Sequence, residues 1–344
     1  MGGTILRIAV IAPYTNPCPP PSYGGESYFW GIADTLGRMG HEVHLFAPKG
    51  SETPTGGFLH IIPHTERGRI DYGIEVRVEQ EYHSVLLACD IVHDCSYDHI
   101  AAERLRHLSG KREIINTING RCYYMPRPPF NVVTGSKAWQ KDAQDHGLKT
   151  EMVYWGVDTG FYTPGTDTIR GDYYLWLARF HPDKGLDLAL ELAEELGFPL
   201  KVAGSMEFAD HAEYGKQYLK KIERLPNVEY VPLPLDETHH EVKRGLYRQA
   251  KGFLYPVNYF ECFGMVVIEA MACGCPVITS DKGAMLELVG QGGFTCKNNE
   301  EFKAVIMGHM AVRHPQKQAS KFNWQNAARG YEEIYRKVIE GYGW

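Results

Sequence analysis

The chain has 344 residues, of which 44% are hydrophobic and 23% charged, and its formal net charge is −6. This balance is close to that of ordinary folded proteins and excludes the disordered and fibrous classes. The length fits two domains of about 150 residues each. The negative net charge argues against nucleic acid as a partner, because such binding needs a basic surface.

Eight cysteines are scattered along the chain without a paired C-x-x-C spacing, which favours reduced thiols over a disulfide framework. Cys273 and Cys275 flank a glycine, but the sequence places no further zinc ligands near them, so we expect no metal site. No run of about 20 apolar residues occurs, and the N-terminus lacks the layout of a signal peptide. We therefore expect a cytoplasmic protein, and the sequence leaves contact with a membrane face open.

Short apolar runs alternate with longer amphipathic segments along the first half, which is the pattern of a doubly wound α/β domain. A proline-rich loop at Pro13–Gly25 precedes helical spacing over Glu26–Met39, and Gly40 ends this helix. The strands expected in this half are Ile5–Ala12, Glu42–Ala47, Ile91–Asp94, Glu113–Ile118, Asn131–Thr134 and Met152–Trp155.

The same alternation restarts after Thr159–Gly171, a segment with proline, glycines and threonines that we interpret as a hinge. The second half is therefore predicted to be another α/β domain. Its expected strands are Tyr173–Ala178, Leu200–Ala203, Val228–Val231, Gly252–Tyr255 and Pro276–Thr279. Its expected helices are Asp187–Leu196, His211–Arg224, His239–Ala250 and one that begins near Gly264.

Residues 260–276 carry the most informative pattern of the chain. Glu261 is expected to end a loop, Phe263-Gly264 to open a helix, and Glu269 to lie in the second turn of that helix. A helix start offers unpaired backbone N–H groups and a partial positive charge, which suit an anionic phosphate. The two carboxylates would then flank a phosphate site.

Arg179 and Lys184 stand five residues apart, directly after the expected strand Tyr173–Ala178. This position is the carboxyl edge of a parallel sheet, where ligands bind in such folds. An Arg-x4-Lys pair on its own is usually part of a solvated loop. Here, beside the two glutamates, the pair resembles the Gly-Arg-x4-Lys-Gly element of a known enzyme family. That resemblance implies a diphosphate site, in which the arginine would offer bidentate donors and the lysine a point charge.

Together these two elements resemble the donor-site signature of retaining glycosyltransferase family 4, which takes a sugar from a nucleoside diphosphate. Tyr-Gly-Gly-Glu at 23–26, followed by Gly-His-Glu-Val at 40–43, is similar to one branch of that family. The resemblance covers essentially the whole chain. It implies the GT-B fold, in which two Rossmann-like doubly wound α/β domains face a central cleft and a C-terminal helix crosses back to the N-terminal domain.

The resemblance implies three parts of the chain. Residues 1–163 would form the N-terminal acceptor domain, residues 164–322 the nucleotide-sugar donor domain, and residues 323–344 a crossover helix that packs on the N-terminal domain. An aromatic stripe supports that helix, because its members share one helical face. The alternative is a helix packed on its own domain. The stripe comprises Phe322, Trp324, Ala327, Tyr331, Ile334, Tyr335 and Val338.

The resemblance also assigns roles. Arg179 and Lys184 would grip the diphosphate, Glu261 would meet the sugar hydroxyls, and Glu269 would bind the ribose hydroxyls. The backbone amides expected at sugar and phosphate belong to Phe263, Gly264, Met265 and Val266. The glycine loop with Gly24 and Gly25 would lie between donor phosphates and acceptor, and a bare Gly-Gly is otherwise a plain turn.

Three positions depart from the family pattern. Cys95 replaces the second histidine of Asp-x-Val-His-x-His, whose first is His93, and Asn119 stands where a histidine usually bonds the donor sugar. Trp155 replaces a usual Asn or His. A lone strand-end histidine is more often structural, and an asparagine cannot become cationic. The expected catalytic set is Arg179, Lys184, Glu261, His93 and Asn119.

The expected activity is retaining transfer of a sugar from a nucleoside-diphosphate sugar, such as UDP-glucose, to a hydroxyl of a saccharide or small molecule. It would need no metal and no cofactor, since the nucleotide sugar is a substrate. The acceptor would dock near Tyr23–Glu26, His93–Ser96 and Asn119–Tyr124. The residues leave the nucleotide base, the sugar and the acceptor open.

Four other functions compete with this one. A disaccharide phosphorylase or synthase would share the fold, and a nucleotide-sugar-binding pseudoenzyme would explain the departures at Asn119 and Trp155. A glycosidase could use the carboxylate pair, but it has no need of a diphosphate clamp. A nicotinamide-dependent oxidoreductase lacks its main support, because the chain has no Gly-x-Gly-x-x-Gly fingerprint in the glycine loop.

Overall fold

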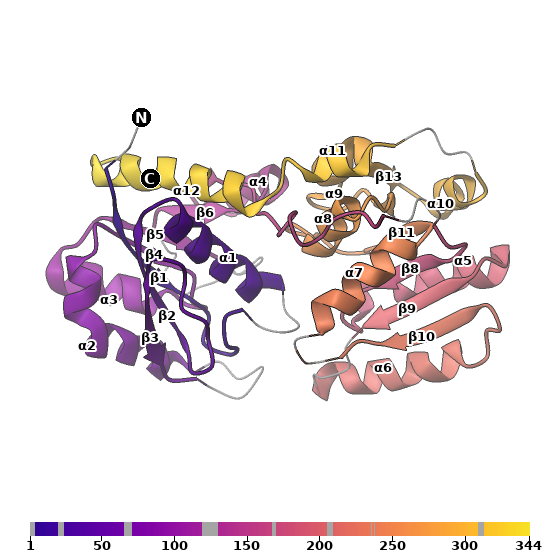
Figure 1. Ribbon diagram of the computed structural model, residues 1–344, viewed down its shortest axis with the longest axis horizontal. Coiled ribbons are helices and arrows are strands. Elements are labelled where there is room, and N and C mark those ends of the chain that lie inside the picture. Colours follow the sequence, from indigo (N-terminus) through magenta and orange to yellow (C-terminus); the bar gives the residue numbers. More distant parts are fainter. Residues whose placement is uncertain are drawn as a thin grey trace. The chain divides into compact units, whose positions relative to one another are not determined.

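The computed structural model describes residues 4–19, 24–64, 71–118, 130–166, 170–204, 209–234, 236, 238–308 and 313–344 (Figure 1). These residues form two compact units. One combines Met1–Gly156 with Trp324–Trp344, and the other is Val157–Asn323. Each unit is built around a parallel sheet, so the expectation of two doubly wound α/β domains is confirmed.

The segment before the expected boundary at Thr163 belongs to the second unit. Val157 forms a parallel β-bridge with Asn323, which is the last residue of that unit. The hydroxyl of Tyr162 lies 2.8 Å from Nδ1 of His240. These contacts place Val157 and Tyr162 in the second unit, ahead of the boundary that the sequence indicates.

In the described part of the first unit, seven strands form a sheet in the order β3-β2-β1-β4-β5-β6-β7. The strands are β1 (Arg7–Ile11), β2 (Glu42–Pro48), β3 (Phe58–Ile62), β4 (Ile91–Asp94), β5 (Ile114–Thr117), β6 (Val132–Thr134) and β7 (Thr150–Met152). The helices are α1 (Gly24–Arg38), α2 (Tyr72–Ala88), α3 (Ile100–Ser109), α4 (Lys137–Asp145) and α12 (Trp324–Ile339). The strand order reverses between β1 and β4, which is where α/β sheets bind ligands.

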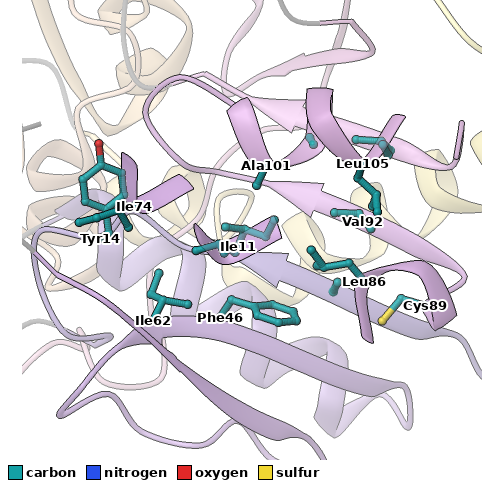
Figure 2. Close-up of a cluster of buried hydrophobic side chains, with 14 residues drawn as sticks. Ile11, Tyr14, Phe46, Ile62, Ile74, Leu86, Cys89, Val92, Ala101 and Leu105 are labelled. Atoms are coloured by element: carbon teal, nitrogen blue, oxygen red, sulfur yellow. The ribbon is translucent and has the colours of Figure 1, made fainter. Parts of the chain in front are cut away.

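Helices α2 and α3 cover one face of this sheet. Figure 2 shows the buried side chains between them, with Ile11, Phe46 and Val92 on strands and Leu86 and Leu105 on the two helices. All five are essentially inaccessible to solvent. Because side chains alternate across a strand, the neighbours of Ile11 and Val92 along β1 and β4 point to the other face.

Helix α12 lies against α1 and β5 within the first unit (Figure 1). Its aromatic face is buried, with Tyr331 and Tyr335 fully enclosed. A Cβ atom at Gly31 would lie 2.2 Å from the ring of Trp324, so α1 and the start of α12 approach as closely as a glycine allows. The predicted aromatic stripe is therefore the packing face of this helix.

The expected strand Met152–Trp155 is shifted. The strand is β7 (Thr150–Met152), which begins before the expected strand and ends at Met152, where the expected strand begins. Beyond it the indole of Trp155 packs over Gly135, where an added Cβ would lie 2.8 Å from the ring. The apolar run therefore extends past the strand, because its last residue, Trp155, packs in an aromatic cluster after β7.

In the second unit the described residues form a six-stranded sheet in the order β10-β9-β8-β11-β12-β13. The strands are β8 (Tyr174–Leu177), β9 (Leu200–Gly204), β10 (Val228–Pro232), β11 (Gly252–Tyr255), β12 (Val277–Ser280) and β13 (Gly293–Cys296). The helices are α5 (Leu186–Leu196), α6 (Ala209–Ile222), α7 (His239–Gln249), α8 (Met265–Ala272), α9 (Met285–Val289), α10 (Asn299–Ile306) and α11 (Pro315–Ala319). Among the described helices, none is long and apolar enough to cross a membrane.

Candidate active site

The loop after β8 holds Lys184 in a fixed position at the carboxyl edge of the second sheet. Residues Pro182–Lys184 form a single 3₁₀ turn, and the Trp176 indole N–H donates to the carbonyl of Lys184 at 3.0 Å. The next residue, Gly185, has φ +71°, and an added Cβ would lie 1.9 Å from the carbonyl oxygen of Pro256. A glycine is therefore required there, and the turn is pressed against the end of β11.

Lys184 and Glu261 form a buried ion pair. The lysine Nζ lies 2.8 Å from Glu261 Oε2 and donates to the Tyr259 hydroxyl at 2.6 Å. The Tyr255 hydroxyl donates to the same carboxylate oxygen at 2.6 Å. Both charged side chains are about one-tenth exposed. The lysine and the first glutamate of the sequence signature thus lie together, although 77 residues separate them.

The surroundings keep Glu261 ionised. Burial acts to raise the pKa of its carboxyl, but the Lys184 ammonium and the hydroxyls of Tyr255 and Tyr259 outweigh that effect and lower it. Burial and the adjacent carboxylate raise the pKa of both tyrosines, so they remain hydrogen-bond donors. The pair therefore presents one carboxylate and one ammonium, each already oriented.

Arg179 follows the same strand and is exposed. It makes no hydrogen bond or ion pair with another residue in the described part of the chain. Its positive charge nevertheless acts on Tyr255 and Tyr259, where it opposes the rise of the pKa of each hydroxyl. Arg179 is thus a cation near the Lys184–Glu261 pair whose donors are available to a ligand.

Helix α8 begins at Met265, as the sequence predicts. Its N-cap is Gly264, with φ +76°, a left-handed conformation that favours glycine. Phe263 is buried, with its ring edge-on to Phe322 at 6.2 Å, whereas Gly264, Met265 and Val266 are partly exposed. The first N–H groups of α8 lack intrahelical partners, which leaves them suited to an anion.

A second glycine supports Glu261 from the loop after β12. Gly283 has φ +57°, and an added Cβ would lie 2.2 Å from the carbonyl oxygen of Glu261. The N–H of Ala284 donates to that carbonyl at 2.8 Å. Gly283 was not predicted from the sequence, although a glycine in the loop after a buried strand, in Asp-Lys-Gly-Ala, is a usable signal.

Glu269 lies in the second turn of α8 and forms a second buried ion pair. Its Oε2 atom lies 2.8 Å from Nζ of Lys243 and accepts from the Tyr247 hydroxyl at 3.2 Å. Side-chain exposure is 8% for Lys243 and 5% for Glu269, so neither charge is solvated. The two signature glutamates therefore share one arrangement, in which a buried lysine and a tyrosine hydroxyl hold each carboxylate.

Arg170 fixes the two helices that carry the second pair. Its Nη1 atom donates to the carbonyls of Tyr247, Arg248 and Ala250 near the end of α7. Its Nη2 atom donates to the carbonyl of Cys273, just after α8. One guanidinium therefore satisfies carbonyl groups at both helix ends, which otherwise lack partners.

The sequence missed the groups that hold the carboxylates. Lys243 and Tyr247 are four residues apart on α7, so they share one helical face. Tyr255 and Tyr259 lie on either side of the turn after β11, just before Glu261. A signal existed for Lys243 and Tyr247, because a lysine and a tyrosine on the inner face of a helix need a partner.

His93, expected to be catalytic, lies in the core of the first unit. Nδ1 lies 2.8 Å from the Tyr335 hydroxyl, Nε2 lies 2.7 Å from Oγ1 of Thr117, and the residue is 1% exposed. Burial lowers the pKa of His93 to about 3, although Asp94 opposes the change. This placement gives His93 a packing role between β4 and α12 and does not support the expected catalytic one.

The other positions that the sequence singled out in the first half differ in their structural setting. Gly24 and Gly25 are the first two residues of α1. Asn119 lies outside the described residues. Trp155 stacks on Tyr28 at 4.5 Å and is 8% exposed, so its departure from the family pattern accompanies a packed aromatic cluster.

A buried carboxylate, Glu75, organises the loop after β4. Its Oε1 atom accepts from the N–H groups of Tyr97 and Asp98 at 3.0 and 3.1 Å, and its Oε2 atom accepts from that of Ile100 at 2.8 Å. Burial raises the pKa of Glu75 to about 7, and the Asp94 carboxylate adds to the rise. The backbone donors oppose this rise without cancelling it.

Glu75 should therefore give stability a distinct pH dependence. Its folded pKa of about 7 lies above the ordinary 4.5, so the folded protein retains a proton that the unfolded chain has released. The stabilising contribution is complete below pH 4.5 and is lost as the pH rises through 7, by up to about 3 kcal/mol. Urea unfolding of wild type and Glu75→Gln between pH 4.5 and 8 measures it.

The difference in the free energy of unfolding between wild type and Glu75→Gln isolates the contribution of Glu75. His93 and His239, whose pKa values burial lowers to about 3 and about 4, are present in both. We expect the wild type to lose stability relative to Glu75→Gln as the pH rises. A difference that does not change over this range contradicts the prediction.

The described residues contain no group of three or more His, Cys, Asp or Glu side chains that could hold a metal ion. Cys273 and Cys275 are buried, and burial raises the pKa of each thiol to about 12. Both sulfurs are therefore protonated near neutral pH, whereas a metal ligand must be a thiolate.

Two parallel-sheet α/β units of this kind define the fold of GT-B glycosyltransferases. The crystal structure of HepE from Anabaena in complex with UDP-glucose is similar, with a TM-score of 0.74 and 16% identity over 96% of this chain and 100% of that chain. This likeness concerns the fold.

Residues 170–323 match the family described as Glycosyl transferases group 1. The matched segment contains Arg179, Lys184, Glu261 and Glu269 and nearly all of the second unit. The second unit is therefore similar to the glycosyltransferases of this family.

Curated relatives also carry glycosyltransferase names. An uncharacterized glycosyltransferase of Methanocaldococcus jannaschii is 26% identical over 251 residues, or 65% of this chain and 65% of that protein. D-inositol 3-phosphate glycosyltransferase of Rhodococcus erythropolis is 27% identical over 225 residues, or 56% of this chain and 50% of that protein. The chain thus spans between half and two thirds of the length of these relatives.

Proposed function

We propose that this protein is a retaining glycosyltransferase of family 4 that moves a sugar from a nucleoside-diphosphate sugar to a hydroxyl acceptor. The observation that carries the proposal is the Lys184–Glu261 pair at the start of α8, with the exposed Arg179 beside it. Cations and a helix N-terminus converge there on the position that a diphosphate would take.

The ion pair explains how the donor would be recognised. A diphosphate offers Lys184 a new anionic partner, and the hydroxyls of the sugar offer Glu261 new donors. Both members of the pair would then exchange one partner for another without being left buried and unpaired. Arg179 would add bidentate donors to the phosphates.

Glu269 has a parallel role in the proposal. Lys243 and Tyr247 hold its Oε2 atom. The carboxylate is therefore held in a fixed rotamer, and its remaining acceptor capacity suits the two hydroxyls of a ribose. This assignment places the nucleoside on the α7 and α8 side of the second sheet.

The reaction would follow a same-face course. The bond between the sugar and the diphosphate loosens, an oxocarbenium-like species forms, and the acceptor oxygen attacks from the side of the leaving group. The acceptor proton passes to the departing phosphate. Arg179, Lys184 and the first turn of α8 stabilise the charge that grows on that phosphate, so the proposal requires no metal ion.

UDP-glucose is the donor we propose, because the structurally similar HepE was crystallised with it. We also infer a cytoplasmic location, because the described cysteines are free thiols, which is typical of a reducing compartment.

A thermal-shift panel tests the proposal. The ligands are UDP, GDP, ADP and their glucose conjugates, each with and without Mg²⁺. A ligand at about 100 times its dissociation constant stabilises the folded state by about 2.7 kcal/mol, which is readily seen as a higher melting temperature. We expect a shift with UDP and UDP-glucose that does not depend on Mg²⁺.

The same panel on Arg179→Ala provides the specificity control, because Arg179 is exposed and its loss should not unfold the protein. The rise in melting temperature caused by UDP and UDP-glucose should become smaller in this variant. A chain that shows no shift with any nucleotide would not be a nucleotide-sugar transferase. A shift that requires Mg²⁺ would contradict metal independence alone.

A further inference from the structure

A pocket of about 740 Å³ lies at the amino edge of the first sheet, opposite the edge at which ligands bind in doubly wound folds. Its lining includes Glu113, Asn131 and Lys149, which directly precede β5, β6 and β7. The end of α3 and the chain after α12, residues 341–344, complete it. The pocket is therefore built within the first unit, whereas the candidate active site belongs to the second.

Asn131 and Trp344 fix one wall of this pocket. The Asn131 Oδ1 atom accepts from the backbone N–H of Trp344 at 3.0 Å, and its Nδ2 atom donates to the carbonyl of Ile114 at 2.8 Å. The Trp344 indole N–H donates to the carbonyl of Val132 at 3.0 Å. Asn131 is buried and has φ +48°, a left-handed conformation that asparagine tolerates better than most residues. The wall is therefore held in place before any ligand arrives.

Three cations line the pocket without an ionic partner. The side chains of Arg106, Arg112 and Lys149 are exposed, and none of them forms a hydrogen bond or ion pair with another described residue. The Arg106 guanidinium lies 4.0 Å from the centre of the Phe130 ring, which also lines the pocket, and this contact orients it. All three cations are thus available to an anion.

The charge balance of the lining favours an anion. Glu113 is the acidic side chain among the described lining residues, and its Oε2 atom lies 3.5 Å from Nζ of Lys111. Arg106 is in the last turn of α3, where a cation also complements the helix dipole. The dipole does not account for Arg112 or Lys149, because both lie outside helices. Their excess positive charge stands out in a chain of net charge −6.

The lining also narrows the class of anion. Guanidinium groups bind phosphate oxygens bidentately, and three cations around one pocket suit more than one phosphate. The polar groups of the neighbouring side chains are already used, since the Tyr342 hydroxyl donates to Glu151 at 3.2 Å and the Trp344 indole N–H bonds within the wall. The two rings therefore offer apolar faces, which suit the C–H groups of a sugar or polyol better than the polar edge of a nucleobase.

We propose that this pocket is a second ligand site, which binds a small sugar or polyol that carries two or more phosphate groups. Arg106, Arg112 and Lys149 bind the phosphates, and the rings of Tyr342 and Trp344 lie against the carbon skeleton. A concave pocket in a chain of net negative charge fits a small anion better than nucleic acid or a membrane face, which need a broad basic surface. The site is independent of the proposed transferase activity.

Isothermal titration calorimetry at low salt tests the site. The probes are fructose 1,6-bisphosphate and myo-inositol hexakisphosphate, and their controls are fructose and myo-inositol, which lack phosphate. We expect the phosphorylated probes to bind with dissociation constants below about 1 mM and the controls not to bind. Inorganic phosphate should bind at least about tenfold more weakly, because one phosphate cannot engage all three cations. Added salt should weaken binding, because it screens exposed charges.

Charge reversal shows whether this pocket is responsible. Arg112→Glu and, separately, Lys149→Glu should each weaken binding of both phosphorylated probes by at least about tenfold, the usual value of one bond to a charged group. Arg77→Glu is the matched control, because Arg77 is exposed on α2 and does not line the pocket, so the affinity should be unchanged. The UDP-induced melting shift should be the same in all three variants.

The outcomes separate this site from the proposed transferase. Absence of binding by both phosphorylated probes, equal affinity for inorganic phosphate, or an equal loss in Arg112→Glu and Arg77→Glu overturns the site. Binding to phosphatidylserine vesicles in place of the soluble probes assigns this surface to a membrane and also overturns it. A UDP-induced melting shift in those cases still supports the transferase. Absence of that shift, with binding of the phosphorylated probes retained, overturns the transferase and leaves this site.

Discussion

Replacement of Arg179 by alanine is expected to lower turnover of the nucleoside-diphosphate sugar by roughly 10²–10³, the cost of removing one preorganised charge stabiliser. Arg179 is exposed and is not paired with another described residue, so the free energy of unfolding should stay within about 0.5 kcal/mol of wild type. Steady-state kinetics and urea unfolding of the same preparation measure the two effects.

Lys184→Ala is expected to cause the same loss of turnover for the same electrostatic reason, but it should also destabilise the protein. Its removal leaves Glu261 buried with two tyrosine hydroxyls and no cation. Breaking a buried pair by removing one partner costs about 3–5 kcal/mol. Turnover should therefore be measured well below the lowered melting temperature of this variant.

Arg224→Ala is the matched control for both substitutions. Arg224 is an exposed arginine in the same unit, but it precedes β10 and so lies at the amino edge of the sheet rather than the carboxyl edge. Its loss should change neither turnover nor stability. Rates near wild type in both Arg179→Ala and Lys184→Ala would remove the diphosphate assignment.

The main outline of the fold could be predicted from the sequence because buried parallel strands are short apolar runs with clear ends. Helix α8 was predictable for a second reason, since Gly264 and Gly274 mark its two ends. Strand β3 was not predicted, because it is an edge strand whose Phe58 and Ile61 are exposed and whose pattern is not alternating. Such a strand is defined by its neighbour β2 and not by its own sequence.

The residues of the candidate site show the same difference between what local sequence contains and what depends on packing. Arg179, Lys184, Glu261 and Glu269 could be selected because local motifs carry them. The spacing of Lys243 and Tyr247 could indicate that the two side chains need a partner, but it could not identify Glu269, because that pairing depends on how α7 packs against α8. Burial is also non-local, which is why the sequence could not show that His93, expected in the catalytic set, is enclosed in the core beside Tyr335 and Thr117.

Lys243 is the position at which this non-local pairing can be measured most directly. Lys243→Met leaves Glu269 buried with the hydroxyls of Tyr247 and Tyr162 and no cation, and we expect a loss of about 3–5 kcal/mol in the free energy of unfolding. Lys216→Met, on the exposed face of α6, should be neutral. Urea unfolding of the three proteins measures the difference.

The double variant Lys243→Met with Glu269→Gln separates the two functions of the pair. Without the carboxylate there is no buried charge to compensate, so most of the lost stability should return. The affinity for UDP should nevertheless remain reduced by about tenfold or more, because an amide cannot accept two ribose hydroxyls as a carboxylate does. If UDP binding recovers together with stability, Glu269 is a structural residue and the ribose is bound elsewhere.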